Sequence, residues 1–175
     1  MPSNSLDLKS IIRDIPDFPK KGIIFKDITP LLRDAEAFRQ AVDIMADHFK
    51  HLKLDVIAGV ESRGFIFCPV LAYKLGIGFI PVRKKGKLPY KTECESYSLE
   101  YGEAVVEMHQ DAVSKGDRVA IVDDLLATGG TAAATARLIE KLGGQVQAIS
   151  FLIELSFLNG REKLAKYPVS SVITY

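Results

Sequence analysis

The chain has 175 residues, long enough to bury a substantial core within one domain. Its formal net charge of +1 gives no field that would attract nucleic acid or a membrane surface, and its apolar runs are too short to span a bilayer. No basic segment followed by an apolar one marks a secretory signal, and Cys68 and Cys94 lie too far apart for a Cys-x-x-Cys motif. We therefore expect one cytoplasmic domain over residues 1–175 that binds neither nucleic acid nor a membrane.

The N-terminal segment combines irregular backbone with apolar side chains. A short helix is expected over about residues 5–13, and the prolines and glycine between Ile15 and Pro30 predict an irregular path. Several apolar side chains in this path need a cover: Phe18, Ile23, Ile24, Phe25 and Ile28. They either pack on the protein's own core or cover a flat ligand, and residue chemistry alone leaves both open.

Strands and helices alternate through the middle of the chain. The clearest amphipathic helix runs from Asp34 to about Leu52, with Asp34 as its N-cap. A strand over residues 55–60, an apolar helix to about Leu75 and a strand over residues 78–83 form a βαβ unit. This alternation predicts an α/β fold with a mainly parallel sheet covered by helices on both faces.

Cations follow the first two strands of this unit. Arg63 stands in Glu61-Ser-Arg-Gly64, where a guanidinium group suits phosphate oxygens better than a pair with Glu61 at a helix N-terminus. The second strand leads into Arg83-Lys-Lys-Gly-Lys87, which is either a solvated face or a contact to an anionic ligand. Residues from about 90 to 109 then predict a polar hairpin that opens for substrates and excludes water when closed.

The most informative stretch is Val119-Ala-Ile-Val-Asp-Asp-Leu-Leu-Ala-Thr-Gly-Gly-Thr131. Four apolar residues predict a buried central strand, with Asp123 and Asp124 at its end. A small-residue loop follows, and then a helix over about residues 132–142. Ligands bind at the carboxyl ends of parallel strands, helix N-termini attract anions, and glycines let backbone amides approach a phosphate. The stretch therefore predicts a site for a phosphorylated sugar, more readily than a loop whose glycines serve packing alone.

This stretch resembles the phosphoribosyl-pyrophosphate signature of the type I phosphoribosyltransferases, and its Asp-Asp-Leu-Leu-Ala-Thr-Gly-Gly-Thr form is similar to the adenine phosphoribosyltransferase branch. Three other segments resemble that branch in the same order: Phe-Pro-x-x-Gly-Ile-x-Phe-x-Asp-Ile-Thr-Pro, Gly-Val-Glu-Ser-Arg-Gly-Phe and Ser-Leu-Glu-Tyr-Gly. The resemblance implies the type I phosphoribosyltransferase fold, with an N-terminal hood over about residues 1–33 and a flexible flap over about residues 90–109. It also implies transfer of a phosphoribosyl group from phosphoribosyl pyrophosphate to adenine, giving AMP and pyrophosphate.

The resemblance further implies roles for single residues. Glu100 would be the general acid/base, and Asp123 and Asp124 would hold ribose hydroxyls and stabilise positive charge at the anomeric carbon. The implied contacts to phosphoribosyl pyrophosphate and AMP are Arg63, Arg83, Lys87, Tyr101, Asp123, Asp124, Ala127, Thr128, Gly129, Gly130 and Thr131. The implied contacts to adenine are Ile24, Phe25, Lys26 and Leu125, with the Phe25 ring stacked on the base.

Magnesium and a second subunit are implied as well. Mg²⁺ would be held mainly by pyrophosphate and water, so no dedicated metal site is expected. A homodimer is implied, with Arg83 or Lys87 a candidate to reach across its interface. Two positions depart from the branch, because Lys21 stands where proline is usual and Lys26 where arginine is usual. The change at Lys26 matters if a guanidinium group reads the base, and not if backbone groups do.

Three alternative functions follow from the same residues. The enzyme could act on another base, such as hypoxanthine or xanthine. A phosphoribosyl-pyrophosphate-sensing regulator would need a nucleic-acid-binding surface, which the net charge and the lack of an added helix-turn-helix segment disfavour. An interaction module without activity is disfavoured by the presence of Glu100, Asp123 and Asp124.

Overall fold

A computed structural model describes residues 6–98 and 103–175 of the chain. The chain forms two compact units, the first ending at Ile44 and the second spanning Met45–Tyr175. In the described residues, no helix is long and apolar enough to cross a membrane.

The first unit contains a two-stranded antiparallel sheet. Helix α1 (Leu8–Ile11) leads into β1 (Arg13–Pro16), which pairs with β2 (Ile24–Asp27). The prediction of irregular backbone was wrong for these two strands. Proline is tolerated here because Pro16 is the last residue of its strand and Pro19 lies in the connection.

Two helices follow this hairpin. Helix α2 (Thr29–Arg33) has proline in its first turn. Proline is tolerated there because a backbone N–H at that position would have no acceptor within the helix. Helix α3 (Ala35–Asp47) confirms Asp34 as an N-cap, because Asp34 Oδ1 accepts the backbone N–H groups of Glu36 and Ala37 at 3.0 and 2.9 Å.

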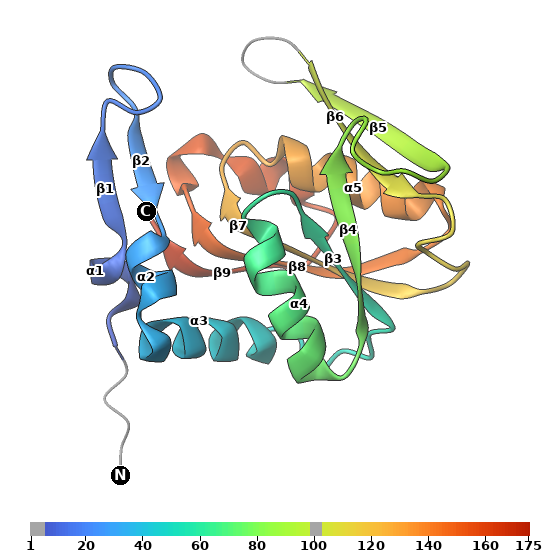
Figure 1. Cartoon of the computed structure of the whole chain (residues 1–175), viewed down its shortest axis with the longest axis horizontal. Coiled ribbons are helices and arrows are strands. Elements are labelled where there is room, and N and C mark those ends of the chain that lie inside the picture. The colour runs from blue at the N-terminus through green and yellow to red at the C-terminus, as the bar shows by residue number, and fades with distance from the viewer. Residues whose placement is uncertain (1–5, 99–102) are drawn as a thin grey trace. The chain divides into compact units, whose positions relative to one another are not determined.

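The second unit is built on a seven-stranded sheet with the order β5-β6-β4-β3-β7-β8-β9 (Figure 1). The strands are β3 (Val56–Val60), β4 (Gly78–Lys84), β5 (Thr92–Ser98), β6 (Glu103–His109), β7 (Arg118–Leu126), β8 (Gln145–Glu154) and β9 (Val169–Thr174). Strands β4, β3, β7, β8 and β9 are parallel, and β6 runs antiparallel to β4 and β5. The predicted mainly parallel sheet is confirmed.

Two crossover helices connect the parallel strands. Helix α4 (Gly64–Leu75) joins β3 to β4, and α5 (Gly130–Lys141) joins β7 to β8. Since β4 and β8 lie on opposite sides of the central β3–β7 pair, right-handed crossovers place the two helices on opposite faces. Figure 1 shows α4 in front of the sheet and α5 behind it. The C-terminal ends of β3 and β7 therefore form a topological switch point, where α/β sheets bind ligands.

Strand β7 is longer than the sequence predicted. Its first apolar residues are fully buried, but the strand continues through both acids to Leu126. The predicted strand end at Asp123 was wrong, because β8 extends equally far and pairs Asp123 with Phe151 and Leu125 with Ile153. Two short 3-10 helices, η1 (Ser156–Leu158) and η2 (Gly160–Leu164), separate β8 from β9.

Candidate active site

The loop after β7 encloses a small cavity at the N-terminus of α5. The cavity has a volume of about 70 Å³ and is lined by Asp123, Leu125, Leu126, Ala127, Thr128, Gly129, Gly130, Thr131, Ala132 and Phe151. The first backbone N–H groups of an α-helix lack partners within the helix and carry a partial positive charge. The structure therefore brings the five predicted phosphate-loop residues together with Asp123 and Leu125, in a place suited to an anion.

This loop is supported from behind by Gly160, the first residue of η2, which was not predicted as a site residue. A Cβ atom on Gly129 would lie 2.4 Å from the carbonyl oxygen of Gly160, and one on Gly160 would lie 2.2 Å from that of Ala127. Both distances are impossible for a real side chain, so the backbones touch only because both positions are glycine. The turn signal Asn159-Gly160 marked a bend here, but no local pattern linked it to the loop.

Asp123 and Asp124 occupy different environments. Asp124 is 5% exposed, and its carboxylate forms an ion pair with the Arg63 guanidinium group. Asp123 Oδ1 accepts the backbone N–H of Asp124 at 2.9 Å, and it lies only 2.8 Å from the position that a Cβ atom on Gly64 would take. Burial raises the pKa of Asp123 well above its usual value and the charge of Asp124 raises it further, against weaker opposition from that N–H and from Arg63. Asp124 thus pairs with a cation, while Asp123, which lines the cavity, binds a proton readily.

The loop between β3 and α4 meets the acids of β7. The peptide bond between Glu61 and Ser62 is cis. Arg63 stands at the N-cap position of α4 and pairs with Asp124, not with the neighbouring Glu61. The two parallel strands are therefore linked at their C-terminal ends by a charged contact.

Glu61 pairs instead with one cation at the end of β4 and one in the loop after it. Its carboxylate accepts hydrogen bonds from the Arg83 guanidinium group at 3.2 Å and from Lys87 Nζ at 2.8 Å. Burial alone would raise the pKa of Glu61, but the hydrogen bonds from Lys87, from Arg83 and from the Lys84 backbone outweigh it and lower the pKa to about 2. Arg83 and Lys87 therefore lie together, beside a carboxylate that the sequence did not connect with them.

A second glutamate, Glu107 on β6, fixes the backbone of the same loop. It is 3% exposed, and its Oε1 accepts the N–H groups of Lys87 and Leu88 at 2.9 and 3.0 Å. Glu107 was not predicted either, because no motif surrounds it in the sequence.

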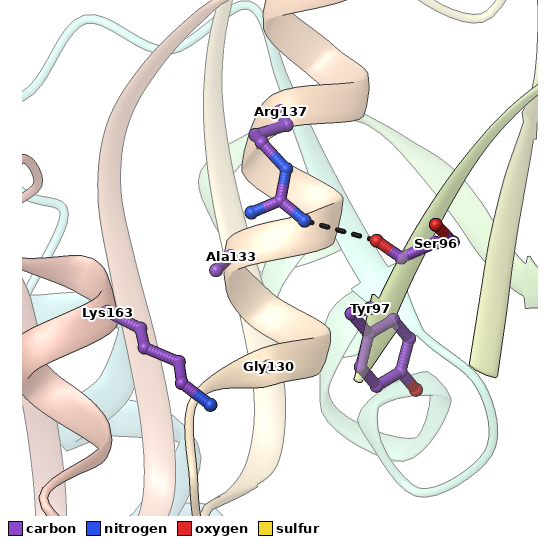
Figure 2. A pocket seen from close by; sticks show the side chains of 6 residues that line it. All are labelled: Ser96, Tyr97, Gly130, Ala133, Arg137 and Lys163. Atoms are coloured by element: carbon purple, nitrogen blue, oxygen red, sulfur yellow. Dashed lines mark hydrogen bonds between the residues drawn. The ribbon is translucent and has the colours of Figure 1, made fainter. Parts of the chain in front are cut away.

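A larger cavity of about 420 Å³ is lined by Ser96, Tyr97, Gly130, Ala133, Arg137 and Lys163 (Figure 2). Arg137 Nη2 donates to the Ser96 carbonyl oxygen at 3.3 Å, and Arg137 Nε pairs with Glu95 at 2.6 Å. One turn further along α5, Lys141 pairs with Glu93 at 2.6 Å. These two pairs fasten β5 to the helix that follows the phosphate loop.

The remaining predicted residues belong to two other segments of the sequence. Glu100 and Tyr101 fall outside the described residues. In β2, the Phe25 ring packs edge to face against Phe18 at 5.3 Å, and Lys26 Nζ pairs with Asp14 at 2.6 Å. Within residues 6–98 and 103–175, no cluster of three or more His, Cys, Asp and Glu side chains could hold a metal ion.

Comparison with known proteins gives consistent matches. The model of the phosphoribosyl transferase domain family matches residues 29–172. An adenine phosphoribosyltransferase from Thermotoga neapolitana is 56% identical over 170 residues, which is 97% of this chain and 100% of that protein. The crystal structure of adenine phosphoribosyltransferase from Thermoanaerobacter pseudethanolicus matches with a TM-score of 0.94 at 56% identity, covering 96% of this chain and 98% of that one. The enzyme from Saccharomyces cerevisiae, complexed with an imino-altritol bisphosphate and adenine, matches with a TM-score of 0.89 at 43% identity, covering 94% and 96%.

The raised pKa of Asp123 predicts a pH-dependent stability difference. The stability that this group contributes is present below the unfolded-state pKa of about 3.9 and is lost as the pH rises through the higher folded-state value. Asp123→Asn removes this loss, so its melting temperature should exceed that of the wild type at about pH 7.5 by about 3 °C, and by much less at about pH 4. Differential scanning calorimetry at both pH values measures this, with the exposed Asp111→Asn as the control that should show no such pH dependence. A difference of equal size at both pH values would contradict the assignment.

The contact between Gly160 and the loop predicts a binding defect. Gly160→Ala should displace Ala127 and Gly129, and so weaken binding of ribose 5-phosphate by roughly tenfold or more in isothermal titration calorimetry. Gly78→Ala is the matched control, because its Cβ would meet only Val56 Cγ2 at 3.9 Å. Unchanged phosphate affinity in Gly160→Ala would show that the loop does not depend on this contact.

Proposed function

Since the chain belongs to the phosphoribosyltransferase family, we propose that the carboxyl edge of its sheet binds phosphoribosyl pyrophosphate. The enzyme is a pentosyltransferase that transfers the 5-phosphoribosyl group to adenine, giving AMP and pyrophosphate in purine salvage. The observation that carries the proposal is the small cavity that Ala127–Thr131 form together with Asp123, the neighbour of Asp124 in β7.

The phosphoribosyl substrate is proposed to span the switch point between β3 and β7. Its 5′-phosphate accepts hydrogen bonds from the backbone of the loop and from the hydroxyls of Thr128 and Thr131. Its pyrophosphate group faces Arg63, Arg83 and Lys87, whose guanidinium and ammonium groups suit phosphate oxygens. The ribose then lies between the loop that binds the 5′-phosphate and the cations that bind the pyrophosphate.

The acids of β7 lie where the ribose of such a substrate would be. Asp124, ion-paired and buried, and Asp123, beside the cavity, accept hydrogen bonds from the ribose hydroxyls. As the bond from C1′ to the pyrophosphate oxygen breaks, positive charge develops at C1′ and is stabilised by these carboxyl groups.

The transfer step forms the bond between C1′ and adenine N9 and breaks the bond between C1′ and the leaving oxygen. Pyrophosphate departs with the electron pair, and the proton on the attacking imidazole ring of adenine passes to Glu100. Tyr101 covers the ribose phosphate. Both roles rest on the resemblance of Ser-Leu-Glu-Tyr-Gly to the family flap over residues 90–109, a segment that keeps water from the reactive centre.

Mg²⁺ is proposed to accompany the pyrophosphate and to neutralise the leaving group. The donors at the sheet edge fit such an ion, because Asp123 and Asp124 offer the hard oxygen atoms that Mg²⁺ and its bound waters prefer. Most of the ligands would be substrate oxygens and water.

Adenine is proposed to bind Ile24, Phe25, Lys26 and Leu125, with the hood of residues 1–33 as part of the single functional domain 1–175. Ion pairing occupies the Lys26 ammonium group with Asp14 across the β1–β2 hairpin, which leaves the backbone of β2 as the group that reads the base edge. This accounts for the lysine where arginine is usual, because the base preference then does not depend on a guanidinium group. We propose that the enzyme acts in the cytoplasm.

A panel of bases tests the proposed function. The wild-type enzyme should release pyrophosphate in a coupled assay with phosphoribosyl pyrophosphate, Mg²⁺ and adenine, and not with hypoxanthine, guanine, xanthine or uracil. Release with another base would overturn the base preference and implicate Lys26. No release with any base would overturn the reaction, provided that the protein is folded.

A homodimer is proposed from the family and from exposed apolar side chains on the α4–β4 face. Tyr73 is 90% exposed, and Val70 and Phe79 are also exposed. Sedimentation equilibrium should give twice the chain mass of 19.3 kDa, and Tyr73→Glu should shift the mass toward one chain. A wild-type protein that sediments as a single chain would contradict the dimer.

A further inference from the structure

Glu61 makes the contacts that an anionic ligand of this site would make. Its Oε2 accepts Arg83 Nε and the Lys84 backbone N–H, both at 3.2 Å. Its Oε1 accepts Arg83 Nη2 at 3.2 Å and Lys87 Nζ at 2.8 Å. A guanidinium fork, an ammonium group and a backbone N–H are the donors that proteins use to hold phosphate oxygens.

The position of Glu61 makes this arrangement stable. Its side chain is 10% exposed, while those of Arg83 and Lys87 are 32% and 49% exposed. Its own backbone N–H donates to the Val82 carbonyl oxygen at 2.8 Å, which places the residue beside the end of β4. The carboxylate is therefore more buried than its two cations, and both cations remain partly exposed to solvent.

The low pKa of Glu61, about 2, keeps this carboxylate ionised at any physiological pH. Pyrophosphate bound to Arg83 and Lys87 would thus meet a fixed negative charge at the same donors. Two like charges at one set of donors disfavour each other.

We propose that Glu61 is a positioning residue that serves as an internal counter-anion: it holds Arg83 and Lys87 in place in the substrate-free enzyme and competes with pyrophosphate for them. This inference rests on the proposed function, in which these two cations bind the pyrophosphate group. Arg83 and Lys87 are kept in one geometry before the substrate arrives, so less conformational entropy is lost on binding. The same charge limits the affinity for the product, which must leave before the next turnover.

The Glu61→Gln substitution removes the negative charge of the side chain and keeps its shape. The amide oxygen still accepts a hydrogen bond, but the competing charge is gone, so inorganic pyrophosphate should bind with Mg²⁺ roughly tenfold more tightly in isothermal titration calorimetry. The KM for phosphoribosyl pyrophosphate should fall and kcat should fall with it, because release of pyrophosphate becomes slower. A residue with a merely structural role would give the opposite split, with weaker pyrophosphate binding and a higher KM, and that result would overturn the proposal.

Glu140→Gln is the matched control. Glu140 is also a glutamate in an ion pair, with Lys166 at 2.7 Å, so the substitution changes the net charge by the same amount away from this cation cluster. Its pyrophosphate affinity should equal that of the wild type. An equal gain in both variants would show that the effect comes from overall charge and would overturn the role of Glu61.

A second measurement needs no substitution at Glu61. In the wild-type enzyme, the backbone amide of Lys84 donates to Glu61, so its NMR resonance should move when pyrophosphate takes over the donors of this carboxylate. A Lys84 resonance that stays fixed through a saturating titration would overturn the competition.

The two proposals fail in distinguishable ways. If the wild type neither binds pyrophosphate nor turns over adenine, the proposed function itself is wrong. If the wild type does both while Glu61→Gln binds pyrophosphate no more tightly, only the role of Glu61 is wrong.

Discussion

The parallel pairing of β3 with β7 is the constraint on which the site depends. Their crossover helices leave in opposite directions, so the C-terminal ends of these two strands are left free of a covering helix. Backbone hydrogen bonds fix the two strands side by side, and the ion pair of Arg63 with Asp124 joins the loop after β3 to the last part of β7. A substrate that contacts both loops therefore meets groups whose spacing is set by the sheet, and not by flexible side chains alone.

Each predicted pyrophosphate-binding cation already has a carboxylate partner within the chain. Arg63 pairs with Asp124, while Arg83 and Lys87 pair with Glu61. Unpaired cations gathered at one sheet edge would repel one another and would collect adventitious anions. Pairing each cation with a carboxylate prevents both effects. A substrate that binds these cations must then replace hydrogen bonds that already exist. The affinity of the site is then a difference between two sets of contacts, which suits an enzyme that has to release a highly charged product.

The sequence predicted what local spacing determines. The stretch from Val119 to Thr131 contains the strand, the acids and the phosphate loop in one run, so its chemistry could be inferred without knowing the fold. The partnership of Glu61 with Arg83 and Lys87 could not, because it joins residues more than twenty positions apart. Gly160 escaped prediction for the same reason, since a close contact between two backbones leaves no periodic pattern. The β1–β2 hairpin was missed because its strands are short and flanked by prolines, and are stabilised by pairing with each other.

The phosphate loop shows why such distant contacts matter. A loop rich in glycine loses more conformational entropy on ordering than other sequences, so an isolated Ala-Thr-Gly-Gly-Thr segment would not hold its amides in one direction. Here β7 fixes its start, the first turn of α5 fixes its end, and the backbone of Gly160 fills the space behind Gly129. Two ion pairs then attach α5 to β5, so the helix that orients the loop is itself held against the hairpin. The conformational entropy of the loop is therefore lost during folding, and a phosphate that binds as proposed would meet a loop that is already ordered.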